Sequence, residues 1–219
     1  MSRFDSIGFD LDGTLWDFTP KVCQAWEPVL RQEPDSIPTP PLATIRRCAG
    51  LTPEEYLAEF FPTVPDAARR QFLYRRCMDS VYATIAKEGG VLYAGVREML
   101  SVLSQRYRLF LVSNCEAQYL KNFLSFYGLH PYFSDAVCFG DTQLGKADNI
   151  RLSMERCGFL HPVYLGDTES DYGAVTKARI PFIHAAYGFG EVPEAIRHIK
   201  TPMDLPGLMA QLENPVEPV

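Results

Sequence analysis

Residues 6–16 read SIGFDLDGTLW, and this stretch decides the fold prediction. Its first four residues, Ser6–Phe9, form a short, mostly apolar run that ends at Asp10. Short runs of this kind, followed by polar residues, are typical of strands buried on both faces of a sheet. The sequence therefore predicts a buried strand whose carboxyl end carries Asp10 and, two residues later, Asp12.

Four further runs of the same type follow: RLFLV at 108–112, DAVCF at 135–139, PVYLG at 162–166 and PFIHA at 181–185. Helical patterns lie between the runs or after them, at 96–107, 116–127, 149–157 and 170–178. Strands that alternate with helices imply parallel pairing. We therefore expect an α/β fold with a Rossmann-like parallel sheet sandwiched by helices.

Polar side chains follow several of the predicted strands directly. Ser113 and Asn114 come after the run at 108–112, and Asp167 comes after the run at 162–166. Ligands of open α/β sheets bind outside the carboxyl ends of the strands. We therefore expect Asp10, Ser113, Asn114 and Asp167 to share one edge of the sheet.

The segment between the first predicted strand and Gly95 interrupts the alternation. A strand-to-helix loop usually has ~2–6 residues, so a segment of this length must contain structure of its own. Helical patterns occur in it at 20–31, 42–48, 53–61 and 65–87, with Thr52 as a helix cap and Gly89-Gly90 as a flexible exit. We expect a helical cap domain at 17–89, inserted by two hinges into a core of residues 1–16 and 90–219.

Four carboxylates would meet at the predicted sheet edge, because Asp171 follows Asp167 in GDTESD and Asp12 follows Asp10. Two like charges about 4 Å apart repel by roughly 4 kcal/mol at an effective dielectric constant of ~20. Several such groups are tolerated only with protonation or with a bound cation. Oxygen ligands without His or Cys suit Mg²⁺ better than Zn²⁺.

The composition is that of a globular protein, with 47% hydrophobic residues and a net charge of −6. The acidity argues against nucleic acid or an anionic membrane as the main partner. The six cysteines form no CxxC pair, and neither a signal peptide nor a membrane-length apolar run is visible. We expect reduced thiols and a cytoplasmic location.

Four motifs in this order resemble those of the haloacid dehalogenase superfamily: DLDGTLW at 10–16, LVSN at 111–114, Lys146 in GKADN and GDTESD at 166–171. The resemblance covers roughly residues 1–16 and 90–190. It implies that Asp10 is a nucleophile that forms an aspartyl-phosphate. It also implies that Asp12 is the general acid and then the general base, and that Lys146 neutralises the phosphoryl group and orients Asp10.

The same resemblance implies a Mg²⁺ site and a phosphoryl site. The metal would be held by Asp10, the backbone carbonyl of Asp12, Asp167 and, directly or through water, Asp171. The phosphoryl group would be bound by Thr14, Ser113, Asn114 and Lys146. Asp17-Phe18 and Ala147 depart from the usual motifs, which leaves the substrate pocket open.

The insert is similar to the helical caps of this superfamily, which close over the cleft and choose the substrate. Arg46 is a candidate to reach a substrate anion, and Gly50 would allow a tight turn near the cleft. The opposing interpretation is a solvated face, because the insert also carries Arg69, Arg70, Arg75 and Arg76.

Simpler interpretations exist for the other residues as well. The DxDG stretch is also a common turn, Asp167 and Asp171 could cap the next helix, and Lys146 could be solvated. Trp16 and Phe18 suit packing at a hinge, although Trp16 could line the cleft. Isolated roles of this kind do not explain four such groups at successive strand ends.

The resemblance favours a phosphatase for a small phosphorylated metabolite, similar to phosphoglycolate, sugar-phosphate or nucleotide-phosphate phosphatases, acting as a monomer or homodimer. One alternative is a phosphomutase that resembles beta-phosphoglucomutase and returns the phosphoryl group to a sugar. Another is a non-catalytic Mg²⁺-binding interaction module. Turnover of p-nitrophenyl phosphate separates the enzymes from the module.

Overall fold

The computed structural model describes residues 3–34, 37–49, 51, 53–193 and 196–213. The predicted turn at Gly50, the predicted cap at Thr52 and the C-terminal residues 214–219 lie outside the described residues.

The elements in chain order are β1 (Ser6–Phe9), β2 (Trp16–Asp17), α1 (Thr19–Arg31), α2 (Leu42–Cys48), α3 (Pro53–Phe60), α4 (Ala67–Glu88), β3 (Val91–Leu92), α5 (Val96–Leu103), β4 (Arg108–Ser113), α6 (Ala117–Tyr127), η1 (His130–Tyr132), β5 (Phe133–Cys138), α7 (Phe139–Thr142), α8 (Lys146–Cys157), β6 (Pro162–Gly166), α9 (Glu169–Ala178), β7 (Phe182–Ala185), β8 (His198–Ile199) and α10 (Asp204–Glu213).

The main sheet has six strands in the order β5-β4-β1-β6-β7-β8, and every pairing is parallel. Strand β1 lies between β4 and β6, with Phe9 opposite Leu111 on one side and Leu165 on the other. The predicted parallel α/β sheet is confirmed, and β8 is an addition that the sequence patterns did not predict.

Alternating residues of the central strands supply two apolar layers, one on each face of the sheet. Leu109 and Leu111 belong to the larger core, whereas Phe110 packs with helices α8 and α9 in a smaller cluster. Gly8 is needed in β1, because a Cβ atom there would lie 2.4 Å from the Phe110 ring and 2.5 Å from the Tyr164 ring. Both faces are therefore buried, which explains the continuous apolar runs of the sequence.

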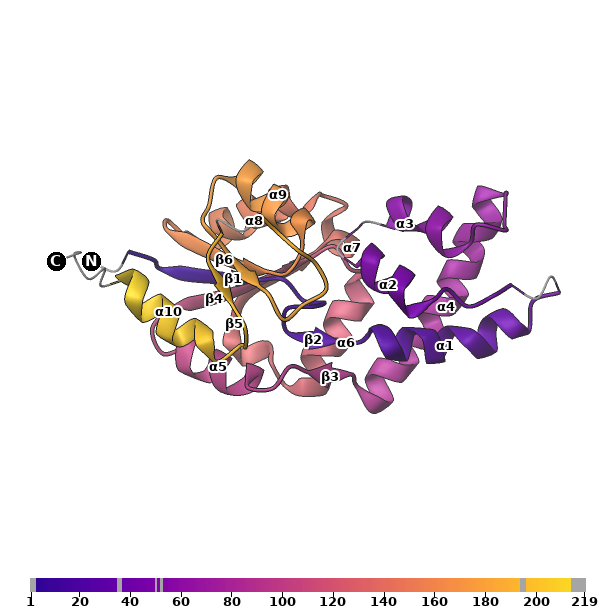
Figure 1. Cartoon of the computed structure of the whole chain (residues 1–219), viewed down its shortest axis with the longest axis horizontal. Coiled ribbons are helices and arrows are strands. Elements are labelled where there is room, and N and C mark those ends of the chain that lie inside the picture. The colour runs from indigo at the N-terminus through magenta and orange to yellow at the C-terminus, as the bar shows by residue number, and fades with distance from the viewer. Residues whose placement is uncertain (1–2, 35–36, 50, 52, 194–195, 214–219) are drawn as a thin grey trace.

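Helices α1 to α4 occupy the interval between β2 and β3 and lie together at one end of the molecule (Figure 1). Strands β2 and β3 form a short antiparallel pair, with Trp16 opposite Leu92, where the chain leaves the sheet and returns. Long helix α4 packs against α1 within the insert and against α6 of the sheet region. The insert is therefore helical, as predicted, and it is joined to the sheet by two adjacent segments.

Aromatic side chains fill this junction. Trp16 and Phe18 are fully buried and stacked, with ring centroids 5.0 Å apart, so their predicted packing role is confirmed. A Cβ atom at Gly90 would lie 2.8 Å from Phe18, and the Tyr127 hydroxyl bonds to both the N–H and the carbonyl of Gly90. Gly90, predicted as part of a flexible exit, is thus held by close packing and by two hydrogen bonds.

Helix boundaries differ from the sequence patterns by a few residues. The pattern at 149–157 missed the first turn of α8, which begins at Lys146, and the pattern at 96–107 ran past the end of α5 at Leu103. No helix in the described part of the chain is long and apolar enough to cross a membrane.

Candidate active site

Three neighbouring strands bring the predicted polar residues to one edge of the sheet. Ser113 ends β4, while Asp10 and Asp167 directly follow β1 and β6. The parallel registers align these ends, and the Asp10 N–H donates to the Leu165 carbonyl at 2.9 Å. The predicted common edge for Asp10, Ser113, Asn114 and Asp167 is therefore present.

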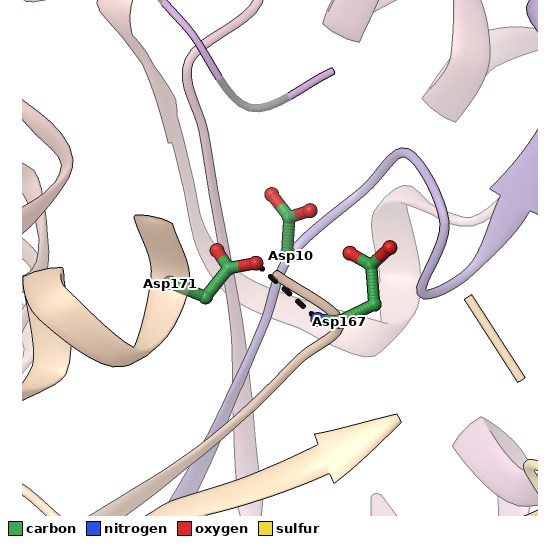
Figure 2. A group of neighbouring side chains, drawn as sticks. All are labelled: Asp10, Asp167 and Asp171. Atoms are coloured by element: carbon green, nitrogen blue, oxygen red, sulfur yellow. Dashed lines mark hydrogen bonds between the residues drawn. The ribbon is translucent and has the colours of Figure 1, made fainter. Parts of the chain in front are cut away.

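The Asp10, Asp167 and Asp171 carboxylates form a buried cluster at this edge (Figure 2). Each of the three residues has one carboxylate oxygen in the cluster, and these three oxygens all lie within 4.8 Å of one another. The Lys146 Nζ atom lies 2.6 Å from Asp10 Oδ1 and 2.6 Å from Asp171 Oδ1. Residues distant in the sequence thus form one cluster of three acids and one base.

The pKa values of these groups reflect mutual repulsion in a buried place. Burial and the neighbouring Asp171 charge raise the pKa of Asp10 to about 7, although Lys146 lowers it. Burial, with the charges of Asp171 and Asp10, raises the pKa of Asp167 well above its usual range. Burial by itself would lower the pKa of Lys146, but the two carboxylates beside it raise that pKa well above the ordinary value. The single positive charge of Lys146 therefore does not balance the three carboxylates of the cluster.

The donor set of this cluster fits a hard divalent cation. Three carboxylates face a single ammonium group, so a dication would balance the charge that remains. Carboxylate oxygens are the ligands that Mg²⁺ prefers, and no His or Cys belongs to the group. Asp171 is the most heavily engaged of the three, because its Oδ1 binds Lys146 and its Oδ2 accepts three hydrogen bonds. Asp167 Oδ1 accepts only a long hydrogen bond of 3.4 Å, from Thr14, so Asp10 and Asp167 fit direct ligation best.

Asp171 organises the start of α9 and the base of the site together. Its Oδ2 accepts from the Asp167 N–H at 3.2 Å, which is the dashed line in Figure 2, and from the Thr168 N–H and hydroxyl at 3.0 and 2.7 Å. The Thr168 hydroxyl in turn accepts from the Asp171 N–H, which completes a capping box. The capping interpretation is correct for Asp171, and the same residue also binds Lys146.

Asp167 is fixed by a loop that the sequence analysis did not single out. Its Oδ2 accepts from the Phe189 N–H at 2.7 Å, and its Oδ1 accepts from the Thr14 hydroxyl at 3.4 Å. Gly13 has a φ of +83°, and a Cβ atom there would lie 2.0 Å from Asp167 Oδ2. Thr14 was predicted to bind the phosphoryl group, but its fully buried hydroxyl points to Asp167.

Asp12 lies on the side of the site that faces the insert. Its Oδ1 accepts from the Tyr119 hydroxyl at 2.7 Å. Burial raises the pKa of Asp12 to about 6, against the Tyr119 hydrogen bond, which lowers it. A carboxyl group with such a pKa can exchange a proton near neutral pH. Tyr119 lies within the predicted helix at 116–127, and the helical pattern does not show where its hydroxyl points.

A cavity of about 110 Å³ separates the sheet edge from the helices of the insert. Asp10, Asp12, Ser113 and Asn114 line its base. Lys146 is not among the lining residues of this cavity and contacts the site through Asp10 and Asp171. The cavity therefore ends at Asp10 and Asp12, the two carboxyl groups that were predicted to act on a substrate.

Arg46, the predicted contact to a substrate anion, is bound elsewhere. Its Nη2 lies 2.7 Å from Asp17 Oδ2, and its Nε donates to the Thr19 hydroxyl at 3.2 Å. The guanidinium group also lies over the Phe189 ring, 5.5 Å from the centroid. The structure thus joins Arg46 to the β2–α1 junction and to the loop beside Asp167, and it lies outside the set of residues that line the cavity.

The family model for haloacid dehalogenase-like hydrolases matches residues 7–185. The chain therefore belongs to this family, and the resemblance drawn from the four motifs is confirmed.

Two relatives of the chain are phosphatases. The chain is 27% identical to phosphoglycolate phosphatase from Escherichia coli O157:H7, over 86% of this chain and 85% of that protein. It is 28% identical to phosphoglycolate phosphatase from Caulobacter vibrioides, over 86% of this chain and 81% of that protein. These matches agree with the predicted enzyme class, a phosphatase of this family.

The fold also matches solved structures. A crystal structure of a predicted phosphoglycolate phosphatase from Haemophilus somnus superposes with a TM-score of 0.79 and 20% identity, covering 95% of this chain and 99% of that one. At this identity the match supports the fold, including the helical insert.

Proposed function

We propose that this protein is a Mg²⁺-dependent phosphatase that hydrolyses a small phosphomonoester through an aspartyl-phosphate on Asp10. The observation that carries the proposal is the position of Asp10. Its carboxylate lies at the base of the cavity, 2.6 Å from Lys146 and within the acidic cluster with Asp167. Phosphoryl transfer depends mostly on positioning and on positive charge around the phosphoryl oxygens.

The metal would be held by Asp10, Asp167 and the backbone carbonyl of Asp12. Asp171 would act through water, because its Oδ1 binds Lys146 and its Oδ2 accepts three hydrogen bonds. When bound, Mg²⁺ supplies positive charge to the phosphoryl oxygens. Lys146 favours the ionised form of Asp10 and orients the carboxylate, since it donates to Oδ1. The second Asp10 oxygen is then the attacking atom.

In the first step an Asp10 oxygen attacks phosphorus, and the bond from phosphorus to the ester oxygen breaks. Asp12 gives its proton to the departing alcohol oxygen. In the second step Asp12 takes a proton from water, whose oxygen attacks phosphorus and releases Asp10 and phosphate. The pKa of about 6 suits Asp12 for both transfers. Ser113 and Asn114, at the cavity base, would hydrogen-bond the phosphoryl oxygens.

We further propose that residues 17–89 act as a lid over the site, joined to the sheet by the two adjacent segments at β2 and β3. Support comes from the cavity, whose walls are shared between the insert and the sheet edge. Closure of such a lid would exclude water from the reaction. The cytoplasmic location and the oligomeric state stay predictions.

The test is release of phosphate from p-nitrophenyl phosphate, measured with Mg²⁺ or EDTA, for wild type and Asp10→Asn. The substitution should lower the rate by on the order of 10³-fold or more, whereas Asp148→Asn, an exposed acid of α8, should not. Wild-type rates for Asp10→Asn would refute the nucleophile. Transfer of the labelled phosphoryl group from the substrate to a sugar phosphate, rather than to water, would favour the mutase.

A further inference from the structure

The cavity in front of Asp10 and Asp12 is largely apolar. Side chains from α1, α2, α3, α4 and α6 form its walls, and many of them are aromatic or aliphatic: Val22, Trp26, Ile45, Leu51, Tyr56, Phe60, Tyr74, Met78, Val81 and Tyr119. A substrate whose phosphoryl group is bound at Asp10 would place its alcohol among these side chains.

The cavity wall carries no cationic side chain in the described part of the chain. Its lining residues include no Lys, Arg or His, and its charged members are Asp10, Asp12 and Glu116. Two of these carboxyl groups belong to the catalytic edge. The third, the partly buried Glu116, precedes α6 and lies near Tyr56 and Tyr74. Burial and the Glu116 charge both raise the pKa of these two tyrosines. The charged side chains that line the cavity are therefore all acidic.

The arginines nearest to the cavity along the chain are already paired. Arg46 and Arg47 lie on α2 between the lining residues Ile45 and Cys48. Arg46 binds Asp17, and Arg47 Nη2 lies 2.8 Å from Glu59 Oε2. Recruiting either cation to a substrate would therefore break an ion pair of the insert.

Transfer of an anionic group from water into this cavity is energetically unfavourable. A carboxylate that leaves water for an apolar cavity needs a cation or several hydrogen-bond donors to replace its hydration. Glu116 adds repulsion instead, because like charges disfavour one another at short range. An ester such as 2-phosphoglycolate would bring a carboxylate of this kind into the cavity along with its phosphoryl group.

On the basis of the proposed phosphatase function, we infer that the preferred substrate is the phosphate ester of a small, uncharged and largely apolar alcohol. The cavity discriminates against alcohols with a second anionic group, so phosphoglycolate is a poor substrate of this chain. The volume of about 110 Å³ is smaller than the ~150 Å³ cavity that holds benzene, and the phosphoryl group takes up part of it, so a short alkyl chain suits it better than a ring.

Matched pairs of esters test this inference on the Mg²⁺-loaded protein. Propyl phosphate is compared with 2-phosphoglycolate, and phenyl phosphate with 4-carboxyphenyl phosphate, so that each pair differs mainly in one carboxylate. The uncharged member should have a kcat/KM at least ~10-fold higher, equivalent to about 1.4 kcal/mol. Equal values, or a preference for the carboxylate, would overturn the inference and leave the phosphatase proposal intact. Failure to hydrolyse all four esters and p-nitrophenyl phosphate would overturn both.

Substitutions in the wall show whether the cavity causes this preference. Met78→Lys places a cation there on a side chain of similar length, and Met78→Gln is its uncharged control. The lysine variant should raise the kcat/KM ratio of 2-phosphoglycolate to propyl phosphate by ~10-fold, and the glutamine variant should leave it near the wild-type value.

Glu116→Gln provides an independent readout, since it removes a negative charge from the same cavity without adding bulk. Its ratio of 2-phosphoglycolate to propyl phosphate turnover should also rise. A cooperative thermal unfolding transition for each variant is the control that it is folded. An unchanged ratio in folded Met78→Lys and in Glu116→Gln would mean that the alcohol does not lie in this cavity, and the inference would be wrong.

Discussion

Replacement of Lys146 by Met is the most informative perturbation of the acidic cluster. The Lys146 side chain is 2% exposed, and its Nζ is 2.6 Å from carboxylate oxygens of both Asp10 and Asp171. Met keeps the length of the side chain and removes the charge, so the carboxylates are left together without their cation. Breaking a buried ion pair in this way typically costs about 3–5 kcal/mol.

The loss should appear as a lower free energy of unfolding in metal-free protein at pH 7.5. For a protein of this size, 1 kcal/mol corresponds to roughly 2–4 °C in Tm, so we expect a decrease of about 6–20 °C. Urea unfolding in EDTA gives the free energy directly. Lys177→Met, which removes an exposed lysine of α9, is the control and should change stability by less than ~0.5 kcal/mol.

The effect of Lys146→Met should depend on pH. The pKa of Asp10 in the folded protein is raised to about 7 from an ordinary value of 3.8. Between these pH values folded Asp10 keeps its carboxyl proton, whereas the unfolded chain has lost it. The resulting stability is present at low pH and is lost as the pH rises through the folded pKa. Without Lys146 the pKa of Asp10 rises further, so the variant should be destabilised more at pH 7.5 than at pH 5.5. Equal stability of variant and wild type at both pH values would refute the electrostatic reasoning.

Two further substitutions test the groups around this cluster. Tyr119→Phe removes the hydrogen bond that lowers the pKa of Asp12, so the basic limb of the pH profile of kcat/KM for propyl phosphate should move to higher pH. An unmoved limb would show that Asp12 is not the acid. Gly13→Ala forces a Cβ atom against Asp167 and requires a strained φ of +83°, so activation by Mg²⁺ should weaken at least ~10-fold. Gly173→Ala, where no atom lies within 4 Å, should not weaken activation, and a Gly13→Ala enzyme with wild-type Mg²⁺ dependence would contradict the geometry.

The sheet and its polar edge could be predicted from sequence because short apolar runs mark the strands, and their alternation with helices implies parallel pairing. Once apolar runs alternate with helices, their carboxyl ends must share an edge, which places Asp10 and Asp167 at the same edge. Their adjacency depends on the strand order, with β1 beside β6, which the runs do not show. The same rule does not reach β2, β3 and β8, since strands of two residues carry no readable period.

The partners of the site residues were less predictable, because they are set by three-dimensional packing. Tyr119 follows the same apolar period as its neighbours on α6, and nothing in that period shows that its hydroxyl binds Asp12. Phe189 binds Asp167 through its backbone N–H, which any residue could supply. Arg46 could be nominated for its charge, but its pairing with Asp17 depends on how α2 meets the β2–α1 junction.

Location of a bound cation is the most direct test of the metal site. Crystals grown with Mn²⁺ in place of Mg²⁺ should give one anomalous peak that contacts carboxylate oxygens of both Asp10 and Asp167, and crystals of Asp167→Asn should lose it. A peak retained in the variant, or a wild-type site with no ion at saturating Mn²⁺, would contradict the assignment of this cluster to a divalent cation.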